Sequence, residues 1–309
     1  MKSIPDRHYS IPVAINLLTV AVCSVLYFFL LYAASHTAKM WILIICGCSF
    51  AAVMIPVYSL IHEAEHSMLH PRPIWNAMLG RWLCALFLVS FTFLTHCHLR
   101  HHNKNRTDIE MWDLYREDQS KWRRRGNLYL MMSGLGYLSL WVSVVLFAFA
   151  PFLVYCGFFQ RHTEIAGFLE GSNQDSKISA IRAESWAALS LQAVTIWALH
   201  LQLWPWLLLF LMHGFVWSSQ NYVNHAFSPR DILNGAHNLR MSGFLRPIYL
   251  NFNLHLAHHQ NPRIPWVHLP EFVPHRTQRI SFFRNYLRLW TGPRLTHEEN
   301  PSLHAPPTR

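Results

Sequence analysis

Histidine is the residue type whose number and spacing first indicate chemistry in this sequence. The 309 residues include 21 histidines, and many of them gather in short segments such as His62-Glu63-Ala64-Glu65-His66 and His255-Leu256-Ala257-His258-His259. Residues three and four apart share one face of a helix, so each segment would project its imidazoles in one direction. Neutral imidazole is a common ligand for iron, zinc and copper. The pattern therefore predicts a metal site.

The number of clustered histidines indicates more than one metal ion. A catalytic zinc ion takes three protein ligands, and the clusters contain many more imidazoles than that. The set suits two metal ions with five or six ligands each. We predict as ligands His62, His66, His98, His101, His102, His225, His255, His258 and His259.

The first cluster also allows a different interpretation. The stretch from His62 to His66 matches H-E-x-x-H, the helical zinc site of metallopeptidases, in which the glutamate is the general base. That interpretation needs one further ligand and leaves most of the clustered histidines without a role. We therefore keep a membrane zinc peptidase as a remote alternative, and expect Glu63 to support a ligand or to be solvated.

The composition indicates an integral membrane protein. Hydrophobic residues make up 52% of the chain and charged residues only 14%. The apolar residues form long uncharged blocks, and about 20 such residues cross a hydrocarbon core. We predict four transmembrane helices in two hairpins, with a kink at Pro205 in the last, at about residues 11–33, 40–61, 128–159 and 186–219.

The metal site should lie just outside the bilayer. The histidine clusters follow the predicted spans or lie in the connecting segments, and the apolar stretch 76–95 should form a half-buried or interfacial helix. The predicted fold is thus an all-α membrane domain covering residues 1–309, with a helical cap at 62–127 and 220–309. His200 and His213 lie inside the last block, where they line a substrate cavity or form hydrogen bonds between helices.

The charge distribution predicts the orientation. The net charge is +10, with ten Lys or Arg between Arg72 and Arg125 and ten more after Gln220. Since basic loops stay in the cytoplasm, both termini and the metal site should be cytoplasmic. We interpret the run 121–125 as an anchor for lipid headgroups. No nucleic-acid recognition motif accompanies the charge. The six cysteines form no C-x-x-C pair, which argues against an iron–sulfur or zinc-ribbon module.

Taken together, HEAEH, HLRHH and HLAHH in this order resemble the three histidine boxes of the membrane-bound fatty acid desaturases and related hydroxylases. The resemblance extends from Ile11 to about Pro270. It includes His225 and Asn221, which match an additional histidine ligand and an asparagine four residues before it in the acyl-CoA desaturases of the family. Asp108, shortly after the second box, resembles part of an acidic stretch often found there. The short spacing of the first box occurs with several substrates and does not fix this one.

The resemblance implies a function and its cofactors. The cofactors would be two iron ions, with O2 as co-substrate, and the reaction would be desaturation of a fatty acyl chain taken from the bilayer. No heme-binding H-P-G-G stretch occurs, so electrons would come from a separate donor of the ferredoxin or cytochrome b5 type. We expect Asn221, Asp108 and His96 to reach the metals through water or to support the ligands. A compact chain without a fused electron-transfer domain favours a bacterial inner membrane over an endoplasmic reticulum.

Two further functions remain open at this point. A di-iron hydroxylase or ketolase acting on a carotenoid, sterol or acyl lipid would begin with the same hydrogen abstraction. A metal transporter would place its ligands near the middle of the bilayer, whereas these clusters lie at the ends of the predicted spans.

Overall fold

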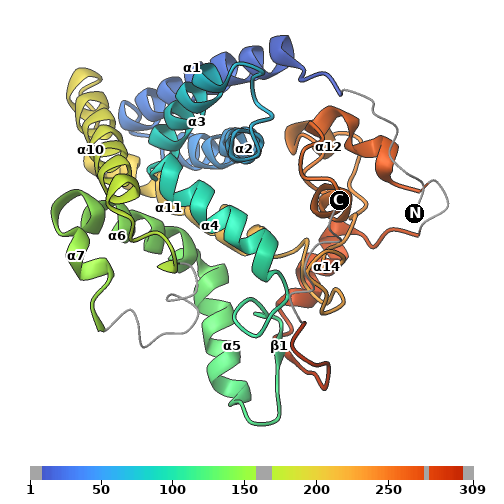
Figure 1. The fold of residues 1–309 in the computed structure, drawn as a ribbon. Helices are drawn as coiled ribbons and strands as arrows, with labels where there is room; N and C mark the ends of the chain where they lie inside the picture. The colour runs from blue at the N-terminus through green and yellow to red at the C-terminus, as the bar shows by residue number, and fades with distance from the viewer. Residues whose placement is uncertain (1–8, 158–168, 275–277, 302–309) are drawn as a thin grey trace.

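A computed structural model describes residues 9–157, 169–274 and 278–301, and it is mostly helical (Figure 1). Small parts of the predicted third span and of the predicted cap, at 158–159, 275–277 and 302–309, lie outside the described residues. The long helices are α1 (Val13–Ser35), α2 (Met40–Glu65), α3 (Pro73–Phe87), α4 (Phe91–Lys104), α6 (Gly136–Phe149), α10 (Asp175–Ala198) and α11 (Leu203–Asn221). The shorter elements are β1 (Leu114–Tyr115), α5 (Lys121–Leu130), the π-helix η1 (Met131–Leu135), α7 (Pro151–Val154), α12 (Leu245–Ile248), α13 (His255–Gln260), the 3₁₀ helix η2 (Trp266–Phe272), α14 (Phe282–Leu289) and β2 (Arg294–Leu295).

Several helices are long and apolar enough to cross a membrane. Three qualify by length and composition, at Val13–Ser35, Met40–Glu65 and Lys121–Phe149, and the bent pair α3–α4 makes a fourth if it is counted as one span. Their apolar side chains are often exposed, as in Leu18, Val25 and Phe29 of α1. Exposed apolar side chains along a 23-residue helix fit a lipid-facing surface. This confirms the predicted helical, membrane-spanning architecture.

The third predicted span begins earlier than expected and ends earlier too. Its helix continues from α5 through η1 to α6 and ends at Phe149, because Pro151 disfavours a helical conformation at Ala150. Within η1, Gly134 has φ 104°, and a Cβ there would approach the backbone N of Phe215 at 3.4 Å. Glycine adopts this φ without strain, and the helix bends at this point.

The fourth predicted span differs most from the structure. Trp206 Nε1 donates to Gln192 Oε1 at 3.3 Å, although residues 14 apart on one continuous helix would be separated by about 21 Å. The chain therefore turns back between α10 and α11 instead of kinking at Pro205. His200, with φ 50°, lies in this turn, and the backbone N–H of Gln202 donates to Ser35 Oγ at the end of α1.

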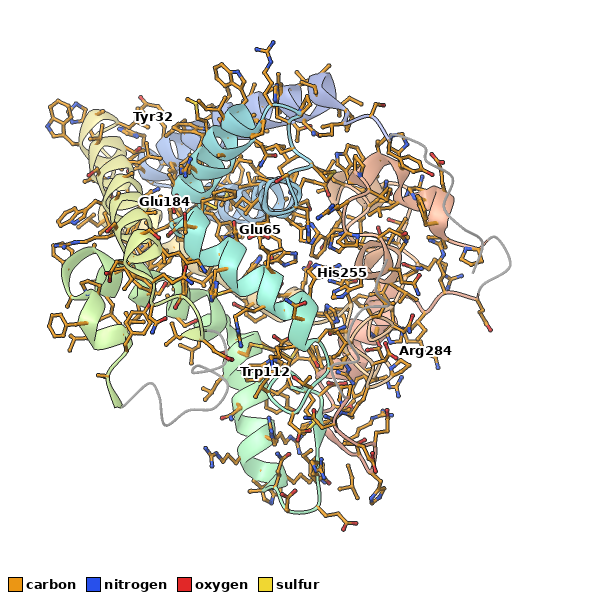
Figure 2. The ribbon with its side chains drawn as sticks, in the orientation of Figure 1. Tyr32, Glu65, Trp112, Glu184, His255 and Arg284 are labelled. Carbon is orange, nitrogen blue, oxygen red and sulfur yellow. The ribbon has the colours of Figure 1, made fainter. Side chains whose placement is uncertain are left out.

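The predicted interfacial helix at 76–95 is also divided in two. The axes of α3 and α4 differ by 97°, and Leu88 takes the left-handed conformation with φ 58° at the bend. Ser90 caps α4 by accepting a hydrogen bond from Phe93 N. Glu184 of α10 accepts further hydrogen bonds from Ser90 Oγ at 2.7 Å and from Thr92 N at 2.7 Å, at the junction visible in Figure 2.

Aromatic side chains fill the core between these helices. Tyr27 of α1, Phe50 of α2 and Phe210 of α11 are fully buried, and their ring centroids lie 5.3–6.3 Å apart. From this bundle, α4 extends toward the C-terminal segment that carries α12 and α14 (Figure 1). The short parallel pair of β1 with β2 ties the end of that segment to the connection between α4 and α5.

Candidate metal centre

The first pair of clustered histidines lies at the end of α2. His62 occupies the last turn of the helix, and His66 is the residue that ends it. Their ring centroids are 5.1 Å apart, as expected for residues four apart on one face. Because the side chain of His62 is buried, the end of α2 directs it into the protein and away from solvent.

The other two boxes divide their histidines between two sites. On α4, His98 and His102 point to one group and His101 to another. On α13, His258 joins the first group, whereas His255 and His259 join the second. The expectation that each box projects three imidazoles in one direction was therefore too simple.

We call the first set the five-histidine group. Its members are His62, His66, His98, His102 and His258, and their ligand atoms all lie within 4.8 Å of one another. His98 Nε2 is 2.7 Å from His66 Nε2 and 3.1 Å from His102 Nε2, which is in turn 3.1 Å from His258 Nε2. Three helices distant in sequence thus contribute to one site.

We call the second set the four-histidine group. It consists of His101, His225, His255 and His259, whose ligand atoms also lie within 4.8 Å of one another. His101 Nε2 and His225 Nε2 are 3.1 Å apart. The groups are neighbours, because the rings of His102 and His259 stack with centroids 4.3 Å apart. In Figure 2, His255 lies beside the C-terminal end of α4.

The imidazole nitrogens of both groups are better arranged to coordinate metal ions than to form hydrogen bonds with one another. A neutral imidazole has one N–H donor and one acceptor, so four Nε2 atoms facing each other in series cannot all be well paired. In addition, His62 Nε2, His255 Nδ1 and His259 Nε2 are buried without a partner among the described residues. A cation in each group would accept all the facing lone pairs at once. The nine side chains therefore fit the two-metal centre that their spacing predicted.

Hydrogen bonds on the far side of two rings fix their orientation. His101 Nδ1 lies 2.6 Å from Glu110 Oε2, and His225 Nδ1 donates to the carbonyl oxygen of Gly235 at 2.8 Å. Such partners hold an imidazole in the tautomer whose other nitrogen faces the metal, and a carboxylate makes the ring more basic. Both oriented rings belong to the four-histidine group.

Burial keeps the candidate ligands in the form that binds metal. It lowers the pKa of His225, His255, His258 and His259 well below the usual value, and neighbouring imidazoles lower it further. These rings are therefore neutral at neutral pH, with a lone pair available for a cation.

A buried ion pair, which the sequence did not reveal, holds the four-histidine group together. Arg106 and Asp113 are fully buried, and Arg106 Nη1 lies 2.5 Å from both Asp113 Oδ1 and Tyr222 Oη. Arg106 Nη2 also donates to the carbonyl oxygen of Ser228 at 2.9 Å. The segment that carries His225 is thereby fastened to the end of α4. The only available signal was the cluster of charged residues after the second box, and it has no periodicity.

The structure places the three predicted supporting residues outside both groups. Tyr58 Oη donates to Asn221 Oδ1 at 3.5 Å, and Asp108 pairs with Arg230 Nη2 at 2.5 Å. His96 Nε2 lies 3.0 Å from the carbonyl oxygen of Glu170. Neither Asp108 nor His96 is among the side chains that meet at the candidate metal positions.

Glu63 has a structural contact instead of the expected ones. It is buried rather than solvated, and its Oε2 accepts a hydrogen bond from Trp266 N at 3.1 Å. It is absent from both groups of candidate ligands. A peptidase would need this carboxylate beside the metal as a base, so its position speaks against that alternative.

Comparison with known proteins identifies the family. The family model described as fatty acid desaturase matches residues 38–291, a range that includes all nine clustered histidines. A search of curated proteins finds no match. Family membership implies a lipid substrate, and the histidine groups agree with the di-metal site typical of the family. The chain therefore belongs to the fatty acid desaturase family of O2-dependent membrane oxidoreductases.

Proposed function

We propose that this protein desaturates a fatty acyl chain at a di-iron site formed by the five-histidine and four-histidine groups. The observation that carries the proposal is the convergence of nine imidazoles into two adjacent sets. Two bound irons would supply reduction of O2 and removal of hydrogen from an unactivated C–H bond. The electrons would come from a separate protein of the ferredoxin or cytochrome b5 type.

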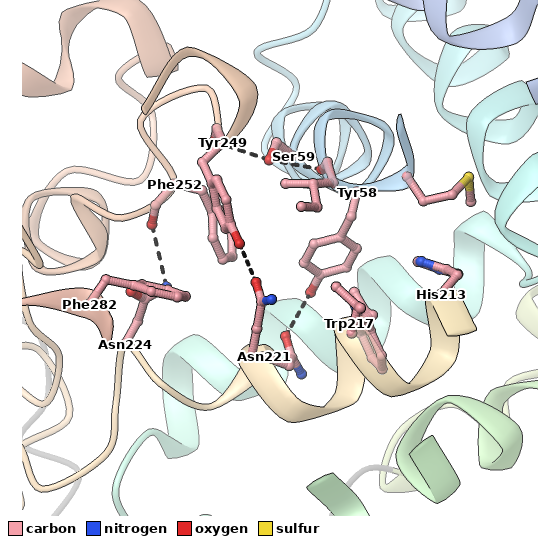
Figure 3. A pocket seen from close by; sticks show the side chains of 13 residues that line it. Tyr58, Ser59, His213, Trp217, Asn221, Asn224, Tyr249, Phe252 and Phe282 are labelled. Carbon is pink, nitrogen blue, oxygen red and sulfur yellow. Dashed lines mark hydrogen bonds between the residues drawn. The ribbon is translucent and has the colours of Figure 1, made fainter. Parts of the chain in front are cut away.

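The protein's own part is to hold the ligands and to position the substrate. A largely apolar pocket opens between α2, α11 and the C-terminal segment, and it is lined in part by Tyr58, Trp217, Tyr249 and Phe252 (Figure 3). The ring of Phe252 also contacts His62 and His255, with centroids 5.0 and 4.8 Å away. Phe252 therefore forms a wall shared by the pocket and both histidine groups. An apolar chain in this pocket would lie next to the site.

Charge supports a cytoplasmic site. The histidine groups are built from α2, α4, α13 and the segment after α11, and the adjoining connections carry most of the basic residues. Basic connections stay on the cytoplasmic side, where soluble electron donors would reach the centre.

A comparison of lipids tests the proposal. The chain would be expressed in a host that supplies ferredoxin or cytochrome b5, beside a His255→Ala, His258→Ala double variant. Mass spectrometry of total fatty acids should show a loss of two hydrogens from an acyl chain that is absent in the double variant. A gain of one oxygen would contradict desaturation and support the hydroxylase alternative. Equal products from both chains would overturn the assignment of the histidines.

A further inference from the structure

His213 of α11 is a buried side chain that the metal centre does not use. It is 1% exposed, and neither ring nitrogen has a hydrogen-bond partner in the part of the chain that the structure describes. The ring packs edge-on against Phe87 and Tyr137, with centroids 5.0 and 4.8 Å away. Burial of an imidazole among aromatic rings without a partner is unfavourable unless something else supplies one.

His213 lines the same pocket as Phe252, at the end away from it in Figure 3. Trp217 lies one helical turn further along α11 and also lines the pocket, and its Nε1 is buried without a partner among the described residues. The two tyrosine hydroxyls in the lining are paired, Tyr58 with Asn221 and Tyr249 with Gln220. His213 and Trp217, whose ring nitrogens are unpaired, thus lie one helical turn apart on α11 in the lining of the pocket.

His213 belongs to neither histidine group, so it is not among the candidate metal ligands. A neutral imidazole can donate one hydrogen bond and accept another, and an indole N–H donates one. This set matches a hydroxyl oxygen, and its two donors also match a carbonyl oxygen.

We propose that His213 and Trp217 bind an oxygen atom on the buried end of the substrate. The preferred substrate would then be a long apolar chain that carries a hydroxyl or carbonyl group remote from the oxidised carbon. This inference rests on the proposed function, because it assumes that the pocket beside Phe252 holds the chain that the metal centre oxidises. A plain hydrocarbon tail would leave the ring nitrogens of His213 and Trp217 unpaired. These two residues would therefore favour an oxygen-bearing chain over a plain one.

Competition between two probes in native mass spectrometry tests the inference. The detergent-solubilised full chain is mixed with equal amounts of methyl palmitate and its omega-hydroxy analogue, and the ratio of the two bound masses is measured. Relative to the wild type, His213→Leu should lower the hydroxy-to-plain ratio about tenfold, since the buried hydroxyl loses its partner. Trp217→Phe, which keeps an aromatic ring but removes the N–H, should lower the ratio less.

Two further variants act as controls. His213→Gln keeps a donor and an acceptor and should stay close to the wild-type ratio. Trp141→Phe removes another buried indole N–H, on a residue that does not line the pocket, and should leave the ratio unchanged. The same ratio in wild type, His213→Leu and Trp217→Phe would overturn the inference and leave His213 as a packing residue. If His213→Leu does not fold, the ratios of Trp217→Phe and His213→Gln still test the inference, because only the first should fall.

The binding ratio is independent of turnover, so the two proposals can fail separately. A changed ratio without any oxidised product would retain the oxygen-binding site and contradict the desaturase proposal. Oxidised methyl palmitate, together with the same ratio in wild type and variants, would support the desaturase proposal and contradict the oxygen-binding site.

Discussion

The five-histidine and four-histidine groups lie side by side but are built differently. All members of the five-histidine group lie on α2, α4 and α13 or at the end of α2. The four-histidine group includes His225, which lies after α11 in a turn. Two of its rings, those of His101 and His225, are also held from behind by Glu110 and Gly235. In the five-histidine group, the nearest carboxylate oxygen is that of Glu65, 3.8 Å from His98 Nδ1 and beyond hydrogen-bond distance.

This difference shows two ways of fixing a metal ligand. A helix that is packed on the core sets the direction of its side chains, so helical spacing suffices for the five-histidine group. A ligand in a turn has no such constraint and needs polar contacts that hold the turn, here the buried network of Arg106, Asp113 and Tyr222. We therefore expect the four-histidine group to depend more on residues that do not touch the metal.

The largest loss of activity is expected when one metal ligand is removed, in two separate variants that each affect a different group. His258 and His259 are neighbours on α13 but belong to different groups. Each alanine variant should abolish desaturation and weaken iron binding in its own group, while the other group, which keeps all its ligands, still binds its iron. Iron content by mass spectrometry and Mössbauer spectra of the two variants would measure this.

His268→Ala is the matched control, because its ring contacts Glu271 and the Ser10 carbonyl and lies outside both groups. It should keep both irons and full activity. Loss of both irons in each ligand variant would contradict the separation of the centre into two groups.

The next largest effect, a loss of stability, is expected from breaking the buried ion pair of Arg106 and Asp113 behind the four-histidine group. Asp113→Asn leaves the charge of Arg106 buried without its counter-ion, which should lower the free energy of unfolding by about 3–5 kcal/mol. Thermal unfolding in detergent would measure the loss, and iron should leave the four-histidine group before the other. Asp118→Asn is the control, since Asp118 is exposed and 4.0 Å from Arg116. Equal effects of both variants would contradict a special role for the buried pair.

The same contrast explains which parts of the site could be predicted from the sequence. All nine histidines that meet in the structure were predicted from their i, i+3 and i+4 spacing and from the resemblance to the three boxes. The division of each box between two groups was not, because spacing on one helix does not show which neighbouring elements approach each side. The partners Arg106 and Asp113 were missed because a contact between the end of α4 and the turn after α11 leaves no periodic signal.

The fold shows a similar limit. Apolar blocks predicted α1 and α2 well, since hydropathy reports burial or contact with lipid. They did not predict the reversal between α10 and α11, because both helices and the turn at 199–202 are uncharged over the predicted span. Hydropathy alone does not distinguish one long helix from two that pack against each other, as Trp206 and Gln192 show.

A smaller effect is expected from the carboxylate that orients His101. Glu110→Gln keeps the size of the side chain but removes the negative charge that faces His101 Nδ1. Loss of such a partner typically weakens metal binding about 10–100-fold. Glu65→Gln in the five-histidine group should have a smaller effect, because its carboxylate is too far from His98 for a hydrogen bond. Titration with a chelator, followed by iron analysis, would rank the two variants.

Glu117→Gln is the control for both, since the Glu117 side chain is 74% exposed and its Oε1 lies 3.7 Å from Nδ1 of the exposed His297 ring, away from both groups. If Glu65→Gln weakened iron binding more than Glu110→Gln, this would contradict the inference that the four-histidine group depends more on residues that do not touch the metal.

The smallest loss of iron is expected from a change that affects both groups equally. Ser90 caps α4, which supplies His98 and His102 to one group and His101 to the other. Ser90→Ala removes the cap and should cost about 1 kcal/mol, lowering iron retention in both groups to a similar extent. Ser120→Ala removes the equivalent cap of α5, which carries no candidate ligand, and should leave iron retention unchanged. If Ser90→Ala released iron from only one group, α4 would not act as a single rigid support, and the two groups would be held more independently than their shared helix implies.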